Sequence, residues 1–441
     1  MVMSPLQDAN DALTYIESRH RFGIKPGLER TEALLDRLGH PERRLRFIHV
    51  AGTNGKGSTC AYLATVLQAA GFRVGLYTSP SLLSFSERIA VNGAPIDANE
   101  LWRCAGQVKD AADPLGDTEL DPTEFEIATA IAFLHFASRQ CEVVVLETGL
   151  GGRYDATNVV TPELSVITNV DLDHTAILGS QLAQIARDKA GVIKPGRPVV
   201  TAAQGAALLE IEEAATAASS AVFRFGREFT AASEGAGSLE GHTFSYFGVY
   251  QDLLGLRTRM LGLHQVENAA VALCALELLA RRGFGPAVKE AMREGVARAH
   301  WPGRMEVLSG DPMVLLDGAH NPAGARALAA ALHPLAPLGW LFVVGVFADK
   351  DIGGILAAVA GLAGAVIVTQ PRAVRAAAAA SVAQQVRAQV AERVPVWIVP
   401  DVAEALDSAL AVQMSAGYAG VCVLGSLSTV SEARQAWTMR T

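Results

Sequence analysis

Short apolar runs that alternate with helical patterns occupy most of the chain. Each run is followed by a polar or Gly-rich turn. Continuous runs of Val, Ile and Leu are typical of strands buried on both faces, and therefore of parallel sheets covered by helices. The pattern predicts an α/β fold with ligands bound at the carboxyl ends of the strands. Strands are predicted at residues 45–50, 74–77, 143–146, 164–168, 313–316, 341–346, 365–369, 396–399 and 421–424.

One region departs from this alternation and helps to divide the chain. Residues 223–261 are rich in Gly, Ser, Thr and aromatics, which predicts an antiparallel excursion with a loose loop at 233–241. A strongly helical segment follows at 264–281. Trp-Pro-Gly then interrupts the helical pattern within 297–304. Because 441 residues exceed what one core usually fills, we expect two domains, 1–298 and 299–441.

Two further segments have an unusual composition. Residues 352–371 carry no charge and are long enough to suggest a membrane span. They are rich in Ala and Gly, are broken by Gly361 and Gly364, and end in a strand-like run. A helix followed by a buried strand is therefore predicted, and no membrane association is expected. The Ala-rich run at 375–380 predicts an exposed helix.

Composition and charge indicate a soluble globular enzyme. Half of the residues are hydrophobic and 19% are charged, with a formal net charge of -8. This charge argues against general nucleic-acid binding, although a few amides and one Lys can still bind a triphosphate. The five cysteines are scattered, as expected of reduced thiols in a cytoplasmic protein. The N-terminal residues show no secretory signal.

The strongest local pattern is VAGTNGKGS at residues 50–58. It follows a predicted strand and precedes a predicted helix at 58–70, which is the context of a phosphate-binding loop. Its glycines let backbone amides face a polyphosphate, the helix N-terminus adds a favourable partial charge, and Lys56 would reach the β- and γ-phosphates.

This loop departs from the strict G-x-x-x-x-G-K-[ST] pattern. Val50 stands at the first Gly position, and Gly57 separates Lys56 from the hydroxyl of Ser58. The alternative is a flexible Gly-rich turn with an exposed Lys.

Acidic residues follow two of the other predicted strands. Glu147 ends one strand, where carboxylates commonly hold magnesium. The next strand leads into Asp171, Asp173 and His174, which are costly to bury unless they are solvated or bind something. The alternatives are a loop anchor for Glu147 and a hydrogen-bonded structural residue for His174.

A helix is predicted at 180–191, with Ser180 as its N-cap. It carries Lys189, which on composition alone is an ordinary exposed helix lysine.

The string GTNGKGS at 52–58 resembles the shortened phosphate loop of the Mur-ligase superfamily, and Gly57 is typical of its folate branch of folylpolyglutamate synthases and dihydrofolate synthases. The resemblance continues in order along the chain, at 264–268, 301–304, 317–322, 347–351 and 424–426. It implies an N-terminal P-loop ATPase domain, with a mostly parallel sheet and a small antiparallel region. It also implies a C-terminal Rossmann-like, doubly wound glutamate-ligase domain.

The resemblance also implies a nucleotide and metal site. One or two magnesium ions are expected on Ser79, Glu147, His174 and an N-carboxylated Lys189, with Ser58 as an alternative ligand. Carboxylation requires a neutral amine, so the pocket must lower the pKa of Lys189. Together with Lys56, the residues Glu147, His174 and Lys189 would be catalytic. The implied ATP contacts are Thr53, Asn54, Gly55, Lys56, Gly57, Ser58, Asn268, Arg304 and Asp317.

The implied substrates are a folate-type acid, L-glutamate and ATP. His320 is the expected contact for the incoming glutamate, and Ser426 is a further expected substrate contact. By pattern alone, Phe125 could instead be a core residue. The positions expected to contact the pteridine are Ile24, Lys25, Pro26, Thr123, Glu124, Phe125, Glu126, Asp155 and Ala156.

The chain differs from its relatives in places. Ser81, Ser84 and Ser86 stand where relatives often have His, Arg and Asn, which puts substrate preference in doubt. Ser428 replaces a common aromatic, and no account of that change is offered.

The implied reaction has two steps. The acceptor carboxylate attacks the γ-phosphate of ATP, and the amine of L-glutamate then attacks the acyl phosphate. The acceptor is dihydropteroate, a reduced folate, or both. Nucleotide contacts in both predicted domains suggest that domain closure assembles the site, and a monomer is expected. The rivals are a cell-wall Mur ligase, disfavoured by the short segment before Lys56, and a P-loop ATPase without ligase activity.

Overall fold

The computed structural model describes the chain except for residues 1–5, 20–22, 24, 236, 336–338 and 441. It divides into two compact units. Unit 1 comprises Met1–Ala231, Tyr246–Leu253 and Glu267–Ala299, and unit 2 comprises Ala232–Ser245, Leu254–Val266 and His300–Thr441. The chain passes from unit 1 to unit 2 for the last time between residues 299 and 300, which lies within the predicted interval 297–304. Two earlier segments, Ala232–Ser245 and Leu254–Val266, also belong to unit 2. The assignment of domains 1–298 and 299–441 stays a prediction.

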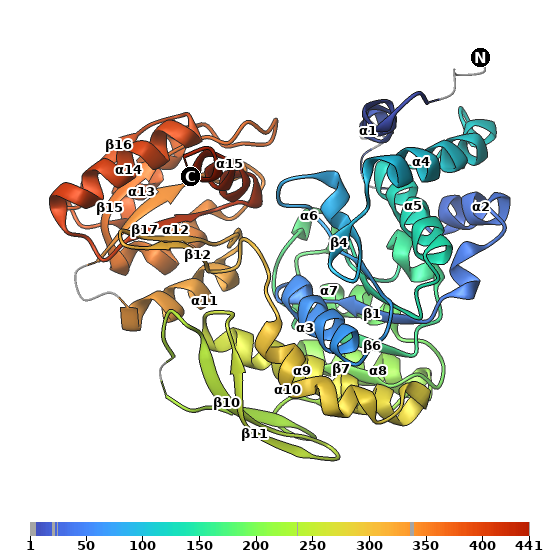
Figure 1. Cartoon of the computed structure of the whole chain (residues 1–441). Helices are drawn as coiled ribbons and strands as arrows, with labels where there is room; N and C mark the ends of the chain where they lie inside the picture. The colour runs from blue at the N-terminus through green and yellow to red at the C-terminus, as the bar shows by residue number, and fades with distance from the viewer. Residues whose placement is uncertain (1–5, 20–22, 24, 236, 336–338, 441) are drawn as a thin grey trace. The chain divides into compact units, whose positions relative to one another are not determined.

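Unit 1 is built on an eight-stranded sheet of order β4-β3-β2-β5-β1-β6-β7-β8 (Figure 1). The six strands from β2 to β8 in this order are parallel neighbours, and β3 and β4 form an antiparallel edge. The strands are β1 Phe47–Ala51, β2 Val74–Tyr77, β3 Ile89–Val91, β4 Ala94–Pro95, β5 Val143–Glu147, β6 Leu164–Ile167, β7 Val199–Thr201 and β8 Val222–Arg224.

Helices cover this sheet because its central strands are buried on both faces. Every residue of β1 and β5 is buried. Helices α1, α2, α4 and α5 share one hydrophobic cluster with these strands, and α3 packs against α10. The helices before residue 300 are α1 Ala9–Ser18, α2 Glu29–Arg37, α3 Lys56–Ala69, α4 Ala98–Ala112, α5 Glu124–Ser138, α6 Thr175–Leu178, α7 Leu182–Lys189, α8 Gly205–Ala217, α9 Leu263–Leu279 and α10 Ala287–Arg298.

A separate three-stranded sheet has the order β11-β10-β9. Its strands are β9 Thr230–Ser233, β10 His242–Phe247 and β11 Asp252–Thr258, and Figure 1 shows β10 and β11 side by side. The predicted loop at 233–241 joins β9 to β10. The predicted start of this region at residue 223 is wrong, because β8 pairs in parallel with β7 and belongs to the large sheet.

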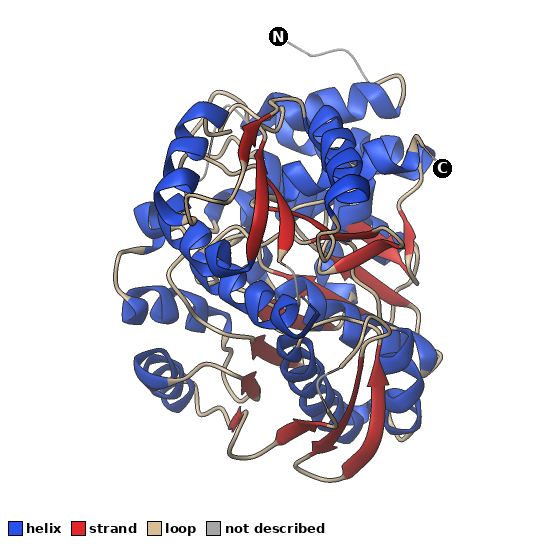
Figure 2. Cartoon of the chain, turned by 90° about the vertical axis from the view of Figure 1, so that its left-hand side faces the viewer, coloured by secondary structure: helices blue, strands red, loops and turns tan. Residues whose placement is uncertain are grey.

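Unit 2 contains a six-stranded sheet of order β12-β13-β17-β14-β15-β16, parallel except for β12. Helices α11, α12 and α13 contact one another in sequence and α14 contacts α15, and Figure 2 shows helices on both sides of the strands. The doubly wound fold is therefore confirmed. The elements are β12 Glu306–Gly310, β13 Met313–Leu316, α11 Pro322–Leu332, β14 Trp340–Val344, α12 Ile352–Val359, β15 Ala363–Val368, α13 Ala379–Gln389, β16 Val396–Ile398, α14 Val402–Ala416, β17 Val421–Leu424 and α15 Leu427–Thr438.

All nine predicted strands are present, and several helix predictions need correction. The helix after the phosphate loop begins at Lys56 rather than Ser58. The N-cap of α7 is Gln181 rather than Ser180, because Gln181 and Gln184 exchange side-chain bonds with each other's backbone.

The predicted exposed helix at 375–380 is also wrong over its first four residues. Their backbone bonds to the segment after β14 instead: Ala377 N–H donates to Val346 O at 2.9 Å, and Ala348 N–H donates to Arg375 O at 2.8 Å. Helix α13 begins only at residue 379.

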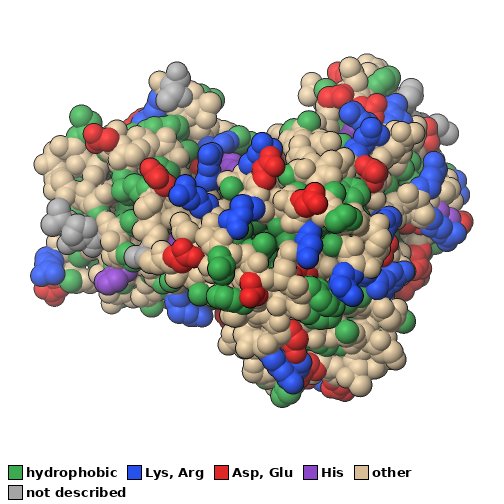
Figure 3. Space-filling model, turned by 60° about the horizontal axis from the view of Figure 1, so that its bottom comes forward, with side chains coloured by type: hydrophobic (Ala, Val, Ile, Leu, Met, Phe, Trp, Pro, Cys, Tyr) green, Lys and Arg blue, Asp and Glu red, His purple; other side chains and the backbone are tan. Residues whose placement is uncertain are grey.

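The uncharged segment 352–371 forms α12 and β15, as predicted. The helical stretch Leu263–Phe284 is apolar and long enough to cross a membrane, but 78% of its most apolar window is buried inside the protein, as in a core helix. On the face drawn in Figure 3, Lys and Arg side chains are interspersed with Asp and Glu side chains.

The contact between α3 and α10 gives a test of the fold. A Cβ added to Gly295 of α10 would lie 2.4 Å from the Cα of Val66 in α3. Gly295→Ala must push the two helices apart, so we expect the free energy of unfolding to fall by about 1–3 kcal/mol. Urea unfolding followed by circular dichroism measures the change.

Gly106→Ala is the matched control. Gly106 also lies within a helix, α4, and a Cβ there meets nothing within 4 Å. This change should be neutral or stabilise by up to about 1 kcal/mol. Equal effects of the two substitutions would contradict the close helix contact.

Candidate functional site

The phosphate loop lies between the end of β1 and the start of α3. Gly52 and Gly55 have φ angles of 149° and 82°, which favour glycine. A Cβ at Gly52 would lie 1.9 Å from Thr168 Oγ1, and one at Gly55 would lie 2.3 Å from Asn268 Oδ1. The loop therefore needs glycine at both positions. Gly57, which the sequence assigned to the curl of the loop, instead lies in the first turn of α3.

Residues after β6 hold this loop in place. Asn169 accepts the Thr53 N–H on its carbonyl oxygen and the Asn54 N–H on its side-chain oxygen, both at 2.9 Å. The Thr168 hydroxyl donates to Asn54 O at 2.7 Å. Asn169 was not among the predicted site residues, although its place directly after a buried strand, two residues before Asp171, was a usable signal.

The Lys56 ammonium lies close to the candidate metal-binding carboxylate. Its Nζ donates to the carbonyl oxygens of Gly52 and Thr53 at 3.1 and 3.3 Å and lies 4.0 Å from Glu147 Oε1. Glu147 is the buried last residue of β5, and its other carboxylate oxygen accepts the Ser79 N–H at 3.2 Å. Lys56, Glu147 and Ser79 therefore come together because β1, β5 and β2 are parallel neighbours.

Lys189 reaches the same loop from the end of α7. Only 4% of the residue is exposed, and its Nζ donates to Gly52 O at 2.9 Å. Burial, and then the charge of Lys56, lower the pKa of Lys189 to about 7. The ordinary exposed lysine is therefore the wrong interpretation, and the amine is readily neutral.

The segment that contains His174 is also tied to the phosphate loop. The Thr53 hydroxyl lies 3.1 Å from both the carbonyl oxygen and the N–H of Asp171. His174 stands at the start of α6 with a φ of 50°, and its Nε2 lies 3.9 Å from Asp173 Oδ1. Its role as a metal ligand stays a prediction.

The predicted pteridine contacts 123–126 form the start of α5. Thr123 and Glu126 form a reciprocal capping box, in which Glu126 accepts the Thr123 N–H at 2.7 Å. The Phe125 ring packs on Gly149, where an added Cβ would lie 2.5 Å from the ring, and its centroid is 5.9 Å from that of Tyr77. Ile24 lies outside the described residues, whereas Lys25 and Pro26 precede α2.

Asp155 stabilises the loop after β5. Its carboxylate accepts the N–H groups of Leu150 at 2.8 Å and Thr157 at 3.0 Å, and it also accepts the Thr157 hydroxyl. Burial raises the pKa of Asp155, while these donors lower it. Ala156 is buried beside it. Pteridine contact by either residue stays a prediction.

In unit 2, Asp317 follows β13 and is held by backbone amides. Its oxygens accept the N–H groups of Met305 and Ala319 at 2.9 and 2.8 Å. Burial raises the pKa of Asp317, and the charge of Arg304 lowers it. A Cβ at Gly318 would lie 2.2 Å from Arg304 Nη1, so the guanidinium lies directly against this loop.

His320, expected to bind glutamate, and Ser426, expected to bind substrate, both have structural partners in unit 2. His320 Nδ1 lies 2.8 Å from Gly318 O. Ser426 is buried at the N-cap of α15, and its hydroxyl accepts the Thr429 N–H at 3.1 Å. The Ser426 hydroxyl thus caps a helix, and substrate binding by it stays a prediction.

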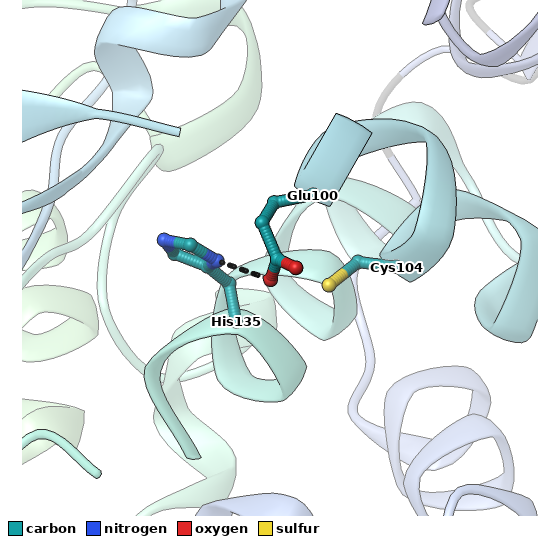
Figure 4. Close-up of side chains that lie close together, drawn as sticks. All are labelled: Glu100, Cys104 and His135. Carbon is teal, nitrogen blue, oxygen red and sulfur yellow. Dashed lines mark ion pairs between the residues drawn. The ribbon is translucent and has the colours of Figure 1, made fainter. Parts of the chain in front are cut away.

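A second polar cluster lies between α4 and α5 (Figure 4). Glu100, Cys104 and His135 offer donor atoms within 4.8 Å of one another, and His135 Nδ1 lies 3.5 Å from Glu100 Oε2. Arg103 donates to both Glu100 oxygens at 2.8 and 3.2 Å, and its Nη2 lies 3.5 Å from Cys104 Sγ. A guanidinium thus already provides the positive charge that this cluster attracts.

Two family models match in chain order. The Mur ligase middle domain matches residues 50–276, and the Mur ligase glutamate ligase domain matches residues 303–427. They include the phosphate loop and the Asp317 loop.

Individual relatives agree. A dihydrofolate synthase/folylpolyglutamate synthase of Bacillus subtilis is 44% identical over 324 residues, covering 73% of this chain and 75% of the relative. Mycobacterium tuberculosis folylpolyglutamate synthase complexed with ADP and AMPPCP has a TM-score of 0.91 and 30% identity, covering 98% and 99% of the two chains. E. coli FolC in complex with DHPP and ADP has a TM-score of 0.85 and 31% identity, covering 99% and 98%.

These similarities span nearly the whole chain. The chain therefore belongs to the Mur ligase superfamily, in the folylpolyglutamate synthase and dihydrofolate synthase family of ATP-dependent ligases.

Proposed function

We propose that this chain joins L-glutamate to the carboxylate of a folate-type acceptor, using ATP and releasing ADP and phosphate. The convergence of Lys56, Glu147 and Lys189 beside Gly52, on a Gly-rich loop at the start of a helix, carries the proposal. The acceptor carboxylate takes up the γ-phosphoryl group, and the glutamate amine displaces phosphate from the acyl phosphate. Phosphoryl transfer mainly requires positioning and neutralisation of charge, which this arrangement can provide.

The loop amides and Lys56 would bind the ATP phosphates, with Asn268 beside Gly55. Arg304 and Asp317 are proposed as further ATP contacts. The proposed magnesium ligands are Ser79, Glu147 and His174. Buried carboxylate oxygens suit Mg²⁺, and Glu147 fits this requirement. When bound, the ion would neutralise charge on the phosphates.

We further propose that Lys189 is N-carboxylated. Its buried amine with a pKa near 7 is available in the neutral form that attacks carbon dioxide. The product is an anion beside the Lys56 ammonium, which would relieve the repulsion between two neighbouring cations. It could also serve a second magnesium ion.

The acceptor would lie against α5 and the loop after β5, and L-glutamate near His320. DHPP bound to the E. coli relative supports a pteridine acceptor. We expect the preference for dihydropteroate or a reduced folate to depend on the loop with Ser81, Ser84 and Ser86. We propose a cytoplasmic monomer, and its five cysteines are free and buried.

The proposal is tested by following ADP release from purified protein with magnesium and ATP. We expect release to require both L-glutamate and a pteridine acid, either dihydropteroate or a tetrahydrofolate. The productive acceptor identifies the subtype. Release that needs neither compound would contradict the ligase proposal and favour a simple ATPase, and turnover of a UDP-linked cell-wall precursor would favour the other Mur ligases.

Replacement of the candidate metal carboxylate should weaken magnesium use. For Glu147→Gln, we expect the half-saturating Mg²⁺ concentration for ADP release to rise by roughly 10- to 100-fold or more. Glu142→Gln is the control, because Glu142 stands just before the same strand and bonds the Arg73 N–H at 2.8 Å. An unchanged Mg²⁺ dependence in Glu147→Gln would exclude Glu147 as a ligand.

Loss of the Lys189 side chain should remove the proposed anion. We expect Lys189→Ala to lower kcat by at least about 100-fold and a short carboxylate such as acetate to restore part of it. Depletion of carbon dioxide should also slow the unmodified enzyme until bicarbonate is added. Lys194→Ala is the control, since Lys194 donates to Asn158 O at 3.0 Å. An enzyme insensitive to carbon dioxide, with no rescue of the variant, would contradict carboxylation.

A further inference from the structure

Arg30, near the start of α2, joins two segments that are far apart in the sequence. Its Nε lies 3.0 and 3.2 Å from the two carboxylate oxygens of Glu126, and its Nη2 lies 2.9 Å from one of them. The same Nη2 donates to the carbonyl oxygen of Lys25. Arg30 and Glu126 are both buried. One planar guanidinium therefore fixes the chain before α2 against the first turn of α5.

The Glu126 carboxylate also stabilises the start of α5. It also accepts the Thr123 N–H at 2.7 Å, which closes the capping box of α5. The bidentate, charge-assisted bonds between Arg30 and Glu126 fix the direction of the guanidinium as well as its distance. The position of Lys25 relative to Thr123 thus depends on two side chains in series, Arg30 and Glu126.

The two residues before Glu126 hold two further segments. Arg88 Nη1 lies 3.3 Å from Glu124 Oε1 and ends the loop that begins at Ser79. The Phe125 ring covers Gly149 in the loop after Glu147. Three consecutive residues of α5 therefore each anchor a different segment, and Arg30 holds the one that the sheet does not support.

We propose that Arg30 is a positioning residue for the pteridine acceptor. It holds residues 25 and 26 in a fixed position relative to residues 123–125, so that the two segments can contact the same pteridine ring. The inference rests on the proposed function, because it takes these two segments as the acceptor site. It adds a specificity-determining role for a side chain that the sequence patterns did not mark.

A lysine cannot replace Arg30 in this role. An ammonium is a point charge that could pair with Glu126, but it lacks the planar fork that also reaches the Lys25 carbonyl. Arg30→Lys therefore separates the two contributions. The ion pair that stabilises the fold is largely retained, whereas the link to the segment before α2 is lost.

The experiment measures steady-state ADP release by Arg30→Lys with each substrate varied in turn. We expect KM for the pteridine to rise about 10-fold, with KM for ATP unchanged. Arg37→Lys is the matched control: Arg37 lies two turns further along α2 and donates to Ala111 O at 2.8 Å, away from α5. A folded Arg30→Lys enzyme with an unchanged pteridine KM, or with both KM values raised equally, would overturn the proposal.

A second variant tests the same connection in case Arg30→Lys does not fold. Glu126→Gln keeps an oxygen for the Thr123 N–H but removes the charge that orients Arg30, and it should raise the pteridine KM in the same way. Combined with Arg30→Lys it should add little, because both changes break one connection. Fully additive effects would contradict a joint role. The unmodified enzyme serves as the reference: if it releases no ADP with glutamate and pteridine, the proposed function fails rather than the role of Arg30.

Discussion

The carbonyl oxygen of Gly52 is the point on which the arrangement of unit 1 converges. It accepts the ammonium of Lys56 at 3.1 Å and that of Lys189 at 2.9 Å, and a side chain at Gly52 would collide with Thr168. Two cations on one neutral oxygen repel each other in a buried place. The nearby Glu147 carboxylate and the low pKa of Lys189 both reduce this repulsion. A site of this kind favours added negative charge, and polyphosphate is a suitable source of it.

The order of the strands determines which residues lie beside these two cations. Because β2, β5, β1 and β6 are adjacent and parallel, their carboxyl ends deliver Ser79, Glu147, the phosphate loop and Asn169 to one edge of the sheet. Lys189 arrives from a helix instead. Its neighbour Asp188 accepts the Gly152 N–H at 2.8 Å, which ties that helix to the loop after β5. The chemistry of the site thus depends on backbone topology before it depends on side-chain identity.

The sequence predicted the strands well because a buried parallel strand has a continuous apolar run. Helix ends were less accurate: the start of α7 depends on reciprocal bonds of two glutamines, which composition does not reveal. Arg30 and Asn169 were missed for a related reason. Their partners lie 96 residues away at Glu126 and 115 away at Asn54, and no local pattern encodes such pairs. Only the place of Asn169 directly after a buried strand marked it as a candidate. The phosphate loop was found because its three glycines and its lysine all lie within residues 52–57.

Several residues expected to touch ligands turn out to bond to the backbone of their own loops. Asp155, Thr123 and Ser426 each accept N–H groups within a few residues of themselves. Asp317 accepts that of Ala319, two residues on, and also that of Met305. Such bonds fix the loop backbone, because a buried carboxylate or hydroxyl that lost these donors would be costly. The loop then presents its own amides, carbonyls and apolar side chains in a fixed shape. A substitution at one of these four positions should therefore change binding by reshaping a loop, even where the side chain never meets the ligand.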